Sequence, residues 1–170
     1  MASQPLIDIA GIDLSKFEFG LDDLREVNPH RFEFEMLDGI IKFTREPLAI
    51  LAIKRVRYGE WWCRGHIPGN PLFPGALMVE AAGQAASFCF HALYGKTEGM
   101  FFGFGGIDEV RFRGTVRPGD DLLLMVKAFQ VRQRRAVFEM QGWVADRLVV
   151  EGKVIGVTLP TSMQSTSEAT

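Results

Sequence analysis

Cysteine is scarce in this sequence of 170 residues, which contains only Cys63 and Cys89. Two thiols are too few for a disulfide framework or a four-ligand zinc site, so we expect free core thiols in a reducing compartment. Long apolar runs are also missing, since no uncharged stretch approaches the ~18 residues that span a membrane. Asp8 and Asp13 stand where a signal peptide would carry basic residues. These absences predict a cytoplasmic protein.

A large excess of one charge is absent as well. The chain has 19 Lys and Arg against 21 Asp and Glu, a net charge of −2, which argues against a protein whose main role is binding nucleic acid. Residues 1–40 hold nine acidic and three basic side chains, so the remainder is mildly basic. The length predicts one domain, and 47% hydrophobic with 24% charged residues is a globular composition.

The two ends of the chain differ from its centre. Residues 1–20 lack sustained periodicity and are interpreted as an N-terminal arm, and 21–27 (LDDLREV) predicts two helical turns that Asn28-Pro29 would end. Residues 160–170 are small, polar and rich in Ser and Thr, so we expect a mobile tail. This leaves 21–159 as the folded domain.

The centre of the chain alternates apolar runs with turn signals, which predicts antiparallel strands joined by short connections. The expected strands are 39–46 and 47–57, which meet near Glu46-Pro47, followed by 107–113, 122–131, 136–145 and 148–158.

One segment breaks the strand pattern. Pro74 at its start and Gly95 at its end predict a helix over 74–94. Apolar residues surround this helix on nearly every side, so it should be buried. Its polar side chains form a single stripe, made of Glu80, Gln84, Ser87 and His91. A curved antiparallel sheet wrapped around one apolar helix is an α+β arrangement called the hotdog fold, which we predict here.

The connection before this helix is stiff and contains a single histidine, His66. Pro68, Pro71 and Pro74 restrict the backbone, and the Ile67-Pro68 bond is a candidate for the cis form. Gly75 offers a backbone N–H at the positive end of the helix dipole, without a Cβ to keep a substrate away. Such an N–H is a candidate oxyanion-hole donor.

The run H-x-P-G-x-P-x-x-P-G-x-L-x-x-E-A-x-x-Q from His66 to Gln84 resembles the 3-hydroxyacyl-[acyl carrier protein] dehydratases of fatty-acid synthesis. Three further stretches resemble motifs of that family in the same order: N-P-H-R-F at 28–32, G-G-I-D-E-V-R-F at 105–112 and V-R-P-G-D at 116–120. The resemblance covers about 21–158. Glu33, Glu35 and Met36, with Trp-Trp-Cys at 61–63, depart from the family pattern and bear on acyl-chain specificity.

The resemblance implies that His66 and Glu80 are the catalytic pair, that Gly75 binds the carbonyl and that Gln84 positions Glu80 or a water. The chemistry agrees: elimination of water needs a base for the C2 proton, a donor to the thioester oxygen and an acid for the 3-hydroxyl. Histidine is largely neutral near pH 7 and can accept the proton. Glu80 can donate one if burial raises the pKa of its carboxyl, which its apolar surroundings favour.

Structural roles are the alternatives for several of these residues. Glu80 could instead pair with an arginine, and Gln84 could serve only as a core hydrogen-bonding residue. Ser87 and His91 are interpreted as hydrogen-bonded core residues. His30 is interpreted as structural, with lining the site entrance as the alternative. Five phenylalanines are expected in the core, and some of them in an acyl tunnel: Phe88, Phe90, Phe101, Phe102 and Phe104.

The resemblance also implies a homodimer, or a higher oligomer built from dimers, in which His66 of one subunit meets Glu80 of the other. Acyl carrier protein is the expected partner, and no metal or other cofactor is expected. Because that protein is acidic, basic residues would guide its docking; the candidates are Arg111, Arg113, Arg117, Arg132, Arg134 and Arg135. A hotdog thioesterase and a non-catalytic hotdog protein that binds acyl carrier protein or lipid are the competing interpretations.

Overall fold

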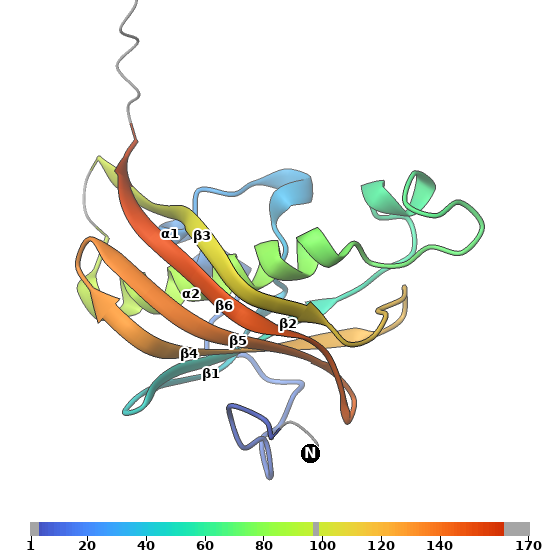
Figure 1. The fold of residues 1–170 in the computed structure, drawn as a ribbon, viewed down its shortest axis with the longest axis horizontal. Helices are drawn as coiled ribbons and strands as arrows, with labels where there is room; N and C mark the ends of the chain where they lie inside the picture. Colours follow the sequence, from blue (N-terminus) through green and yellow to red (C-terminus); the bar gives the residue numbers. More distant parts are fainter. Residues whose placement is uncertain (1–3, 97–98, 162–170) are drawn as a thin grey trace, which may run out of the picture.

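The computed structural model describes residues 4–96 and 99–161. It contains one six-stranded antiparallel sheet that curves around a long helix, α2 (Figure 1). The expected tail at 160–170 lies almost entirely outside the described residues. The elements, in chain order, are α1 (Leu21–Val27), β1 (Gly39–Arg45), β2 (Leu48–Arg55), α2 (Gly75–Tyr94), β3 (Met100–Phe112), β4 (Asp121–Arg132), β5 (Arg135–Val144) and β6 (Arg147–Pro160), with single 3₁₀ turns at Phe32–Phe34 and Trp61–Arg64.

The strand order is β1-β2-β4-β5-β6-β3, so the strand that follows α2 crosses to the far edge of the sheet. All the predicted strands are present, and the hotdog architecture is confirmed. β3 begins at Met100, seven residues earlier than its apolar pattern indicated, because its first half pairs with the end of β6 from Met100–Pro160 onward. The cis peptide bond lies at Glu46-Pro47, between β1 and β2, so the expectation of a cis bond at Ile67-Pro68 was wrong.

The core lies between α2 and the concave face of the sheet. Small residues on the helix, including Ala81, Ala82 and Ala85, are fully buried and let the helix approach the strands closely. Facing them are inward side chains such as Leu124 and Phe138, which are also fully buried. Between its two exposed ends the helix is covered on every side, which explains its apolar composition, because charged residues would find no solvent there.

The outer face of the sheet is covered by the N-terminal arm. A second apolar cluster gathers Leu51, Leu123 and Trp143, and Leu6, Ile12 and Phe17 of the arm pack against it. Gln141 fixes the arm by accepting from the Leu6 N–H at 2.9 Å. Gly39 makes room for the ring of Phe17, because a Cβ there would stand 2.5 Å from it.

Both thiols are free, as expected, and burial raises the pKa of Cys89 to about 12. In the described part of the chain, none of the helices has the length and apolar character needed to cross a membrane.

Candidate active site

Glu80 lies on the second turn of α2, with its side chain 18% exposed. Its Oε1 atom accepts from Gln84 Nε2 at 2.8 Å and stands 3.2 Å from His30 Nε2. The expected stripe on α2 therefore supplies the first contact, since Gln84 follows Glu80 by one helical turn. The second contact comes from a segment fifty residues earlier in the chain.

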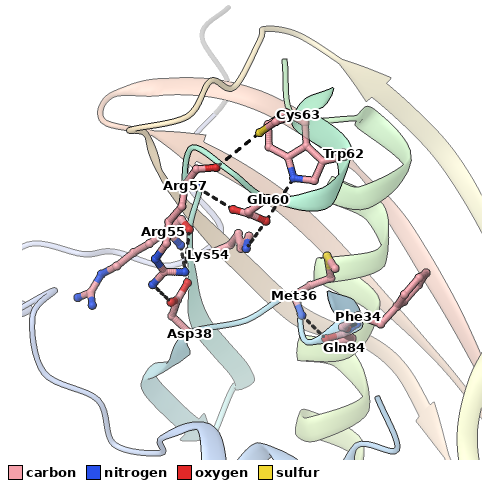
Figure 2. A network of polar contacts seen from close by, with 10 residues as sticks. All are labelled: Phe34, Met36, Asp38, Lys54, Arg55, Arg57, Glu60, Trp62, Cys63 and Gln84. Atoms are coloured by element: carbon pink, nitrogen blue, oxygen red, sulfur yellow. Dashed lines mark hydrogen bonds and ion pairs between the residues drawn. The ribbon is translucent and has the colours of Figure 1, made fainter. Parts of the chain in front are cut away.

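Gln84 is itself held firmly by the backbone of the 34–36 segment. It donates to the Phe34 carbonyl at 2.8 Å, and its Oε1 accepts from the Met36 N–H at 3.0 Å (Figure 2). Both ends of the amide are engaged, which fixes the orientation of the N–H group that reaches Glu80.

The ionisation of Glu80 differs from the sequence expectation. Burial raises the pKa of this carboxyl. The hydrogen bonds from His30 and Gln84, together with the electrostatic effect of His30, lower the pKa by a larger amount. The pKa of Glu80 therefore lies below its ordinary value, and the prediction of a raised pKa was wrong for the protomer. The alternative of an ion pair with an arginine was also wrong, because the ionisable side chain in contact with Glu80 is that of His30.

Glu80 opens into an apolar pocket of about 160 Å³ between α2 and strands β3 and β6. Phe101, Phe102 and Phe104 line it, as expected for part of the phenylalanine set. Phe104 is 46% exposed and therefore not a core residue, whereas Phe88 and Phe90 are buried as predicted. The helix leaves space for the Phe104 ring at Gly83, where a Cβ would stand 2.3 Å from that ring.

His66 lies elsewhere. It is exposed on the loop that projects beyond the N-terminal end of α2 (Figure 1), and its Nδ1 contacts the Leu72 carbonyl at 2.7 Å. Within the described chain it makes no hydrogen bond or ion pair with Glu80. A single protomer therefore does not bring the two predicted catalytic residues together.

Gly75 is the first residue of α2, as a carbonyl-binding N–H requires. Among the described residues, its N–H has no backbone acceptor. A Cβ at this position would stand 2.7 Å from the ring of Phe112 on β3. Glycine thus serves two purposes here, because it leaves the helix end open and admits the Phe112 ring.

The base of the His66 loop is fixed by a polar network (Figure 2). Glu60 Oε2 accepts from Lys54 Nζ at 2.8 Å and from the Trp62 indole at 3.2 Å. Its other oxygen accepts from the Arg57 N–H at 2.7 Å, and the Arg57 guanidinium pairs with Asp38. These contacts join β2 to the start of the loop.

The candidate docking arginines fall into two groups at opposite ends of the sheet. The β4–β5 hairpin, with Arg132, Arg134 and Arg135, lies beside the last residues of β6, whereas Arg117 contacts Asn70 in the His66 loop at 2.5 Å. Arg111 and Arg113 line one cleft and so face the same side, as predicted. Arg113 is paired with Glu151 at 2.6 Å, which reduces the charge that it offers to a partner.

Ser87 and His91 are buried, as predicted, but only partly hydrogen bonded. His91 Nδ1 contacts the Gly95 carbonyl at 3.2 Å, while Ser87 Oγ and His91 Nε2 have no partner among the described residues. The interpretation of both as fully hydrogen-bonded core residues was therefore wrong. No three histidine, cysteine or carboxylate side chains gather as a metal site in residues 4–96 and 99–161.

His30 is the functional candidate that the sequence placed in a structural role. Its contact with Glu80 joins the 28–32 stretch to α2, and no local pattern indicates such a long-range contact. The one signal in the sequence was that His30 and Glu80 both lie in motifs that resemble the same family, which could have suggested that they share a site.

The family model described as a FabA-like domain matches residues 28–155. A 3-hydroxyacyl-[acyl-carrier-protein] dehydratase FabZ from Pectobacterium atrosepticum is 36% identical over 123 residues, 72% of this chain and 80% of its own. A FabZ from Escherichia coli is 38% identical over 136 residues, 79% of this chain and 85% of its own.

Among solved structures, the dehydratase heterocomplex ApeI:P from Xenorhabdus doucetiae matches with a TM-score of 0.68 and 14% identity, covering 81% of this chain and 91% of that chain. A thioesterase from Pseudomonas aeruginosa matches with a TM-score of 0.62 and 15% identity, covering 82% and 94%. At these identities the structural matches establish the shared fold.

Proposed function

This chain belongs to the FabA-like domain family, and we propose that it catalyses the dehydration named in its FabZ relatives. The substrate is a (3R)-3-hydroxyacyl thioester of acyl carrier protein and the product is the trans-2-enoyl thioester, in fatty-acid or related lipid biosynthesis. The observation that carries this proposal is the partly buried Glu80 carboxyl, held by Gln84 and His30 at the mouth of an apolar pocket. A pocket of this kind suits an acyl chain beside a proton-transfer group.

The proposed chemistry uses three groups. The His66 imidazole takes the proton from C2 while the Gly75 N–H binds the thioester oxygen, where negative charge develops. The electron pair of the C2–H bond forms the C2–C3 double bond, and the C3–O bond breaks. Glu80 supplies the proton that the departing hydroxyl needs to leave as water.

The site requires a second copy of the chain, since His66 and Glu80 are separate in the protomer. β3 is an edge strand with several exposed apolar side chains: Phe104 at 46%, Ile107 at 53% and Phe112 at 55%. An exposed apolar edge of this length favours pairing with another strand. Antiparallel pairing of β3 with β3 across a two-fold axis would bury these residues and bring the second subunit's His66 loop toward Glu80.

The same two-fold arrangement bears on carrier-protein docking. Because the two sheets would run in opposite directions, the Arg132–Arg135 hairpin of one subunit would lie at the end occupied by the second subunit's His66 loop. Arg117 lies beside that loop. We therefore assign the docking rim to Arg117 and the hairpin, with Arg111 and the paired Arg113 as secondary members, and an acidic carrier protein as the partner.

The test is a product assay on a 3-hydroxyacyl-carrier-protein thioester. Dehydration produces a 2-enoyl thioester with its own absorbance and mass and releases no free thiol. Release of thiol without enoyl product would establish a thioesterase, and neither product with retained binding of the acylated carrier protein would establish a binding module. A series of acyl chain lengths, with the double-bond position determined by mass spectrometry, then defines specificity and any isomerisation.

A further inference from the structure

His30 occupies a fixed position beside Glu80. It follows Pro29, which restricts the backbone, in the turn after α1. The Arg31 guanidinium closes this turn by donating to the carbonyl oxygens of Asn28 at 2.8 Å, His30 at 2.6 Å and Arg25 at 2.9 Å. Three contacts from one side chain hold the backbone from which the imidazole reaches Glu80.

The surroundings make His30 the ionisable partner of Glu80. Of the residues that line the acyl pocket, only these two are ionisable, and the side chains from β3 and β6 are apolar or glycine. On its other side, His30 borders a small cavity of about 10 Å³ that Arg25 and Glu35 also line. Arg25 and Glu35 form an ion pair of 2.7 Å, so their charges largely cancel.

The lowered pKa of Glu80 conflicts with its proposed role as the proton donor, and His30 can resolve this conflict. Glu80 must deliver a proton near neutral pH, yet its pKa lies below the ordinary value because His30 and Gln84 stabilise the carboxylate. His30 Nε2 stands 3.2 Å from Glu80 Oε1, so a proton can move between the imidazole and the carboxyl along this contact. The two side chains can therefore hold one transferable proton jointly.

We propose that His30 is a positioning residue for Glu80, which fixes the carboxyl through its Nε2–H and shares with it the proton that the 3-hydroxyl takes. This inference rests on the proposed dehydratase site. As the C3–O bond breaks, the proton passes from His30 Nε2 to Glu80 and from Glu80 to the departing oxygen. The pair loses one proton and His66 gains one from C2, so transfer from His66 through solvent restores both groups.

Two substitutions separate positioning from proton sharing. His30→Gln places an amide N–H near the location of Nε2, so it keeps the donor to Glu80 but cannot lend it a proton. His30→Asn places its amide near the location of Nδ1, out of reach of Glu80. We expect kcat to fall about 10- to 100-fold in His30→Asn with little change in KM, because the lost interaction serves the transition state.

His30→Gln should retain kcat within about 10-fold at its own optimum. The alkaline limb of its pH profile should move to lower pH by about one unit or more, since Glu80 alone must then hold the proton. His91→Gln is the control, because it makes the same substitution at a histidine that lies three turns beyond Glu80 along α2, without contact to Glu80. It should leave kcat and the pH profile unchanged.

Thermal unfolding of all three variants shows whether a loss of activity reflects a loss of folded protein. The proposal is overturned if His30→Asn keeps the wild-type kcat and pH profile. It is equally overturned if His30→Gln and His30→Asn lose the same activity with an unmoved alkaline limb, which would give His30 a structural role only. Absence of dehydration in the wild-type protein would instead reject the proposed function, so the two failures are distinguishable.

Discussion

Lys54 on β2 and Glu60 at the start of the His66 loop form an ion pair of 2.8 Å, with side chains only 6% and 16% exposed. The pair joins the sheet to a segment whose apolar anchors are Trp62 and Phe73, each 2% exposed. Burial removes both charges from water, so each charge is stabilised mainly by the opposite charge of its partner. The position of His66 is thereby linked to a residue of the core sheet.

Glu60→Gln should destabilise the protein by about 3 kcal/mol, because it leaves the Lys54 ammonium buried without a counter-charge. The double variant Lys54→Met with Glu60→Gln should recover much of this loss, since a buried pair replaced by uncharged groups is often close to neutral. Chemical denaturation of the wild type, both single variants and the double variant measures the coupling. Additive effects would show that the ion pair does not stabilise the loop.

Mixing two inactive variants tests the shared site. His66→Ala and Glu80→Ala protomers should each be inactive as homodimers. After subunit exchange, a mixed dimer would contain one site with both residues intact, so activity should return to at most about half of the wild-type value per mixed dimer. Exchange is verified with differently tagged chains. No recovery after verified exchange would place both residues of a site in one subunit.

Glu80→Gln keeps the size and the hydrogen bonds of the side chain but removes its acidic proton. Turnover should fall about 10²- to 10⁴-fold with little change in substrate binding. His66→Asn should be at least as damaging because it removes the base. Single-turnover kinetics with the carrier-protein substrate measure both, and near-normal turnover in either variant would remove that residue from the mechanism.

Glu80 should also make the stability of the protein depend on pH. Its pKa in the folded chain lies below the ordinary value of 4.5, so the ionised carboxylate contributes stability above about pH 4.5. This contribution is lost as the pH falls through the lower, folded-state pKa. The difference in Tm between the wild type and Glu80→Gln should therefore shrink on acidification from about pH 6 to about pH 3. A difference in Tm that stays constant over this pH range would contradict a lowered pKa of Glu80 in the folded protein.

Charge reversal at Arg132, Arg134 and Arg135 should lower kcat/KM for the carrier-protein substrate, and added salt should reduce the difference from wild type. Reversal at Arg113 should have a smaller effect on docking because Glu151 already pairs with it. A small thioester mimic carries no acidic protein, so activity on it should survive. Equal losses on both substrates would show that these arginines support the fold or the site.

The sequence by itself determined the elements whose signals are local. Pro74 and Gly95 bracket α2, and its apolar composition shows that the helix is buried. Turn residues separated the later strands to within a few residues, and the motif from His66 to Gln84 identified the family. Local steric and hydrogen-bonding preferences, which act between near neighbours in the chain, suffice to predict the helix and the strands, whereas the family was identified by the resemblance of its motifs.

The tertiary structure decided everything that depends on contacts between distant segments. The start of β3 at Met100 follows from pairing with the end of β6, and the contact of His30 with Glu80 joins segments fifty residues apart. The sign of the Glu80 pKa shift was decided in the same way: burial was evident from the sequence, but the opposing hydrogen bonds were not. Electrostatic effects depend on distances through space, which the order of residues does not specify.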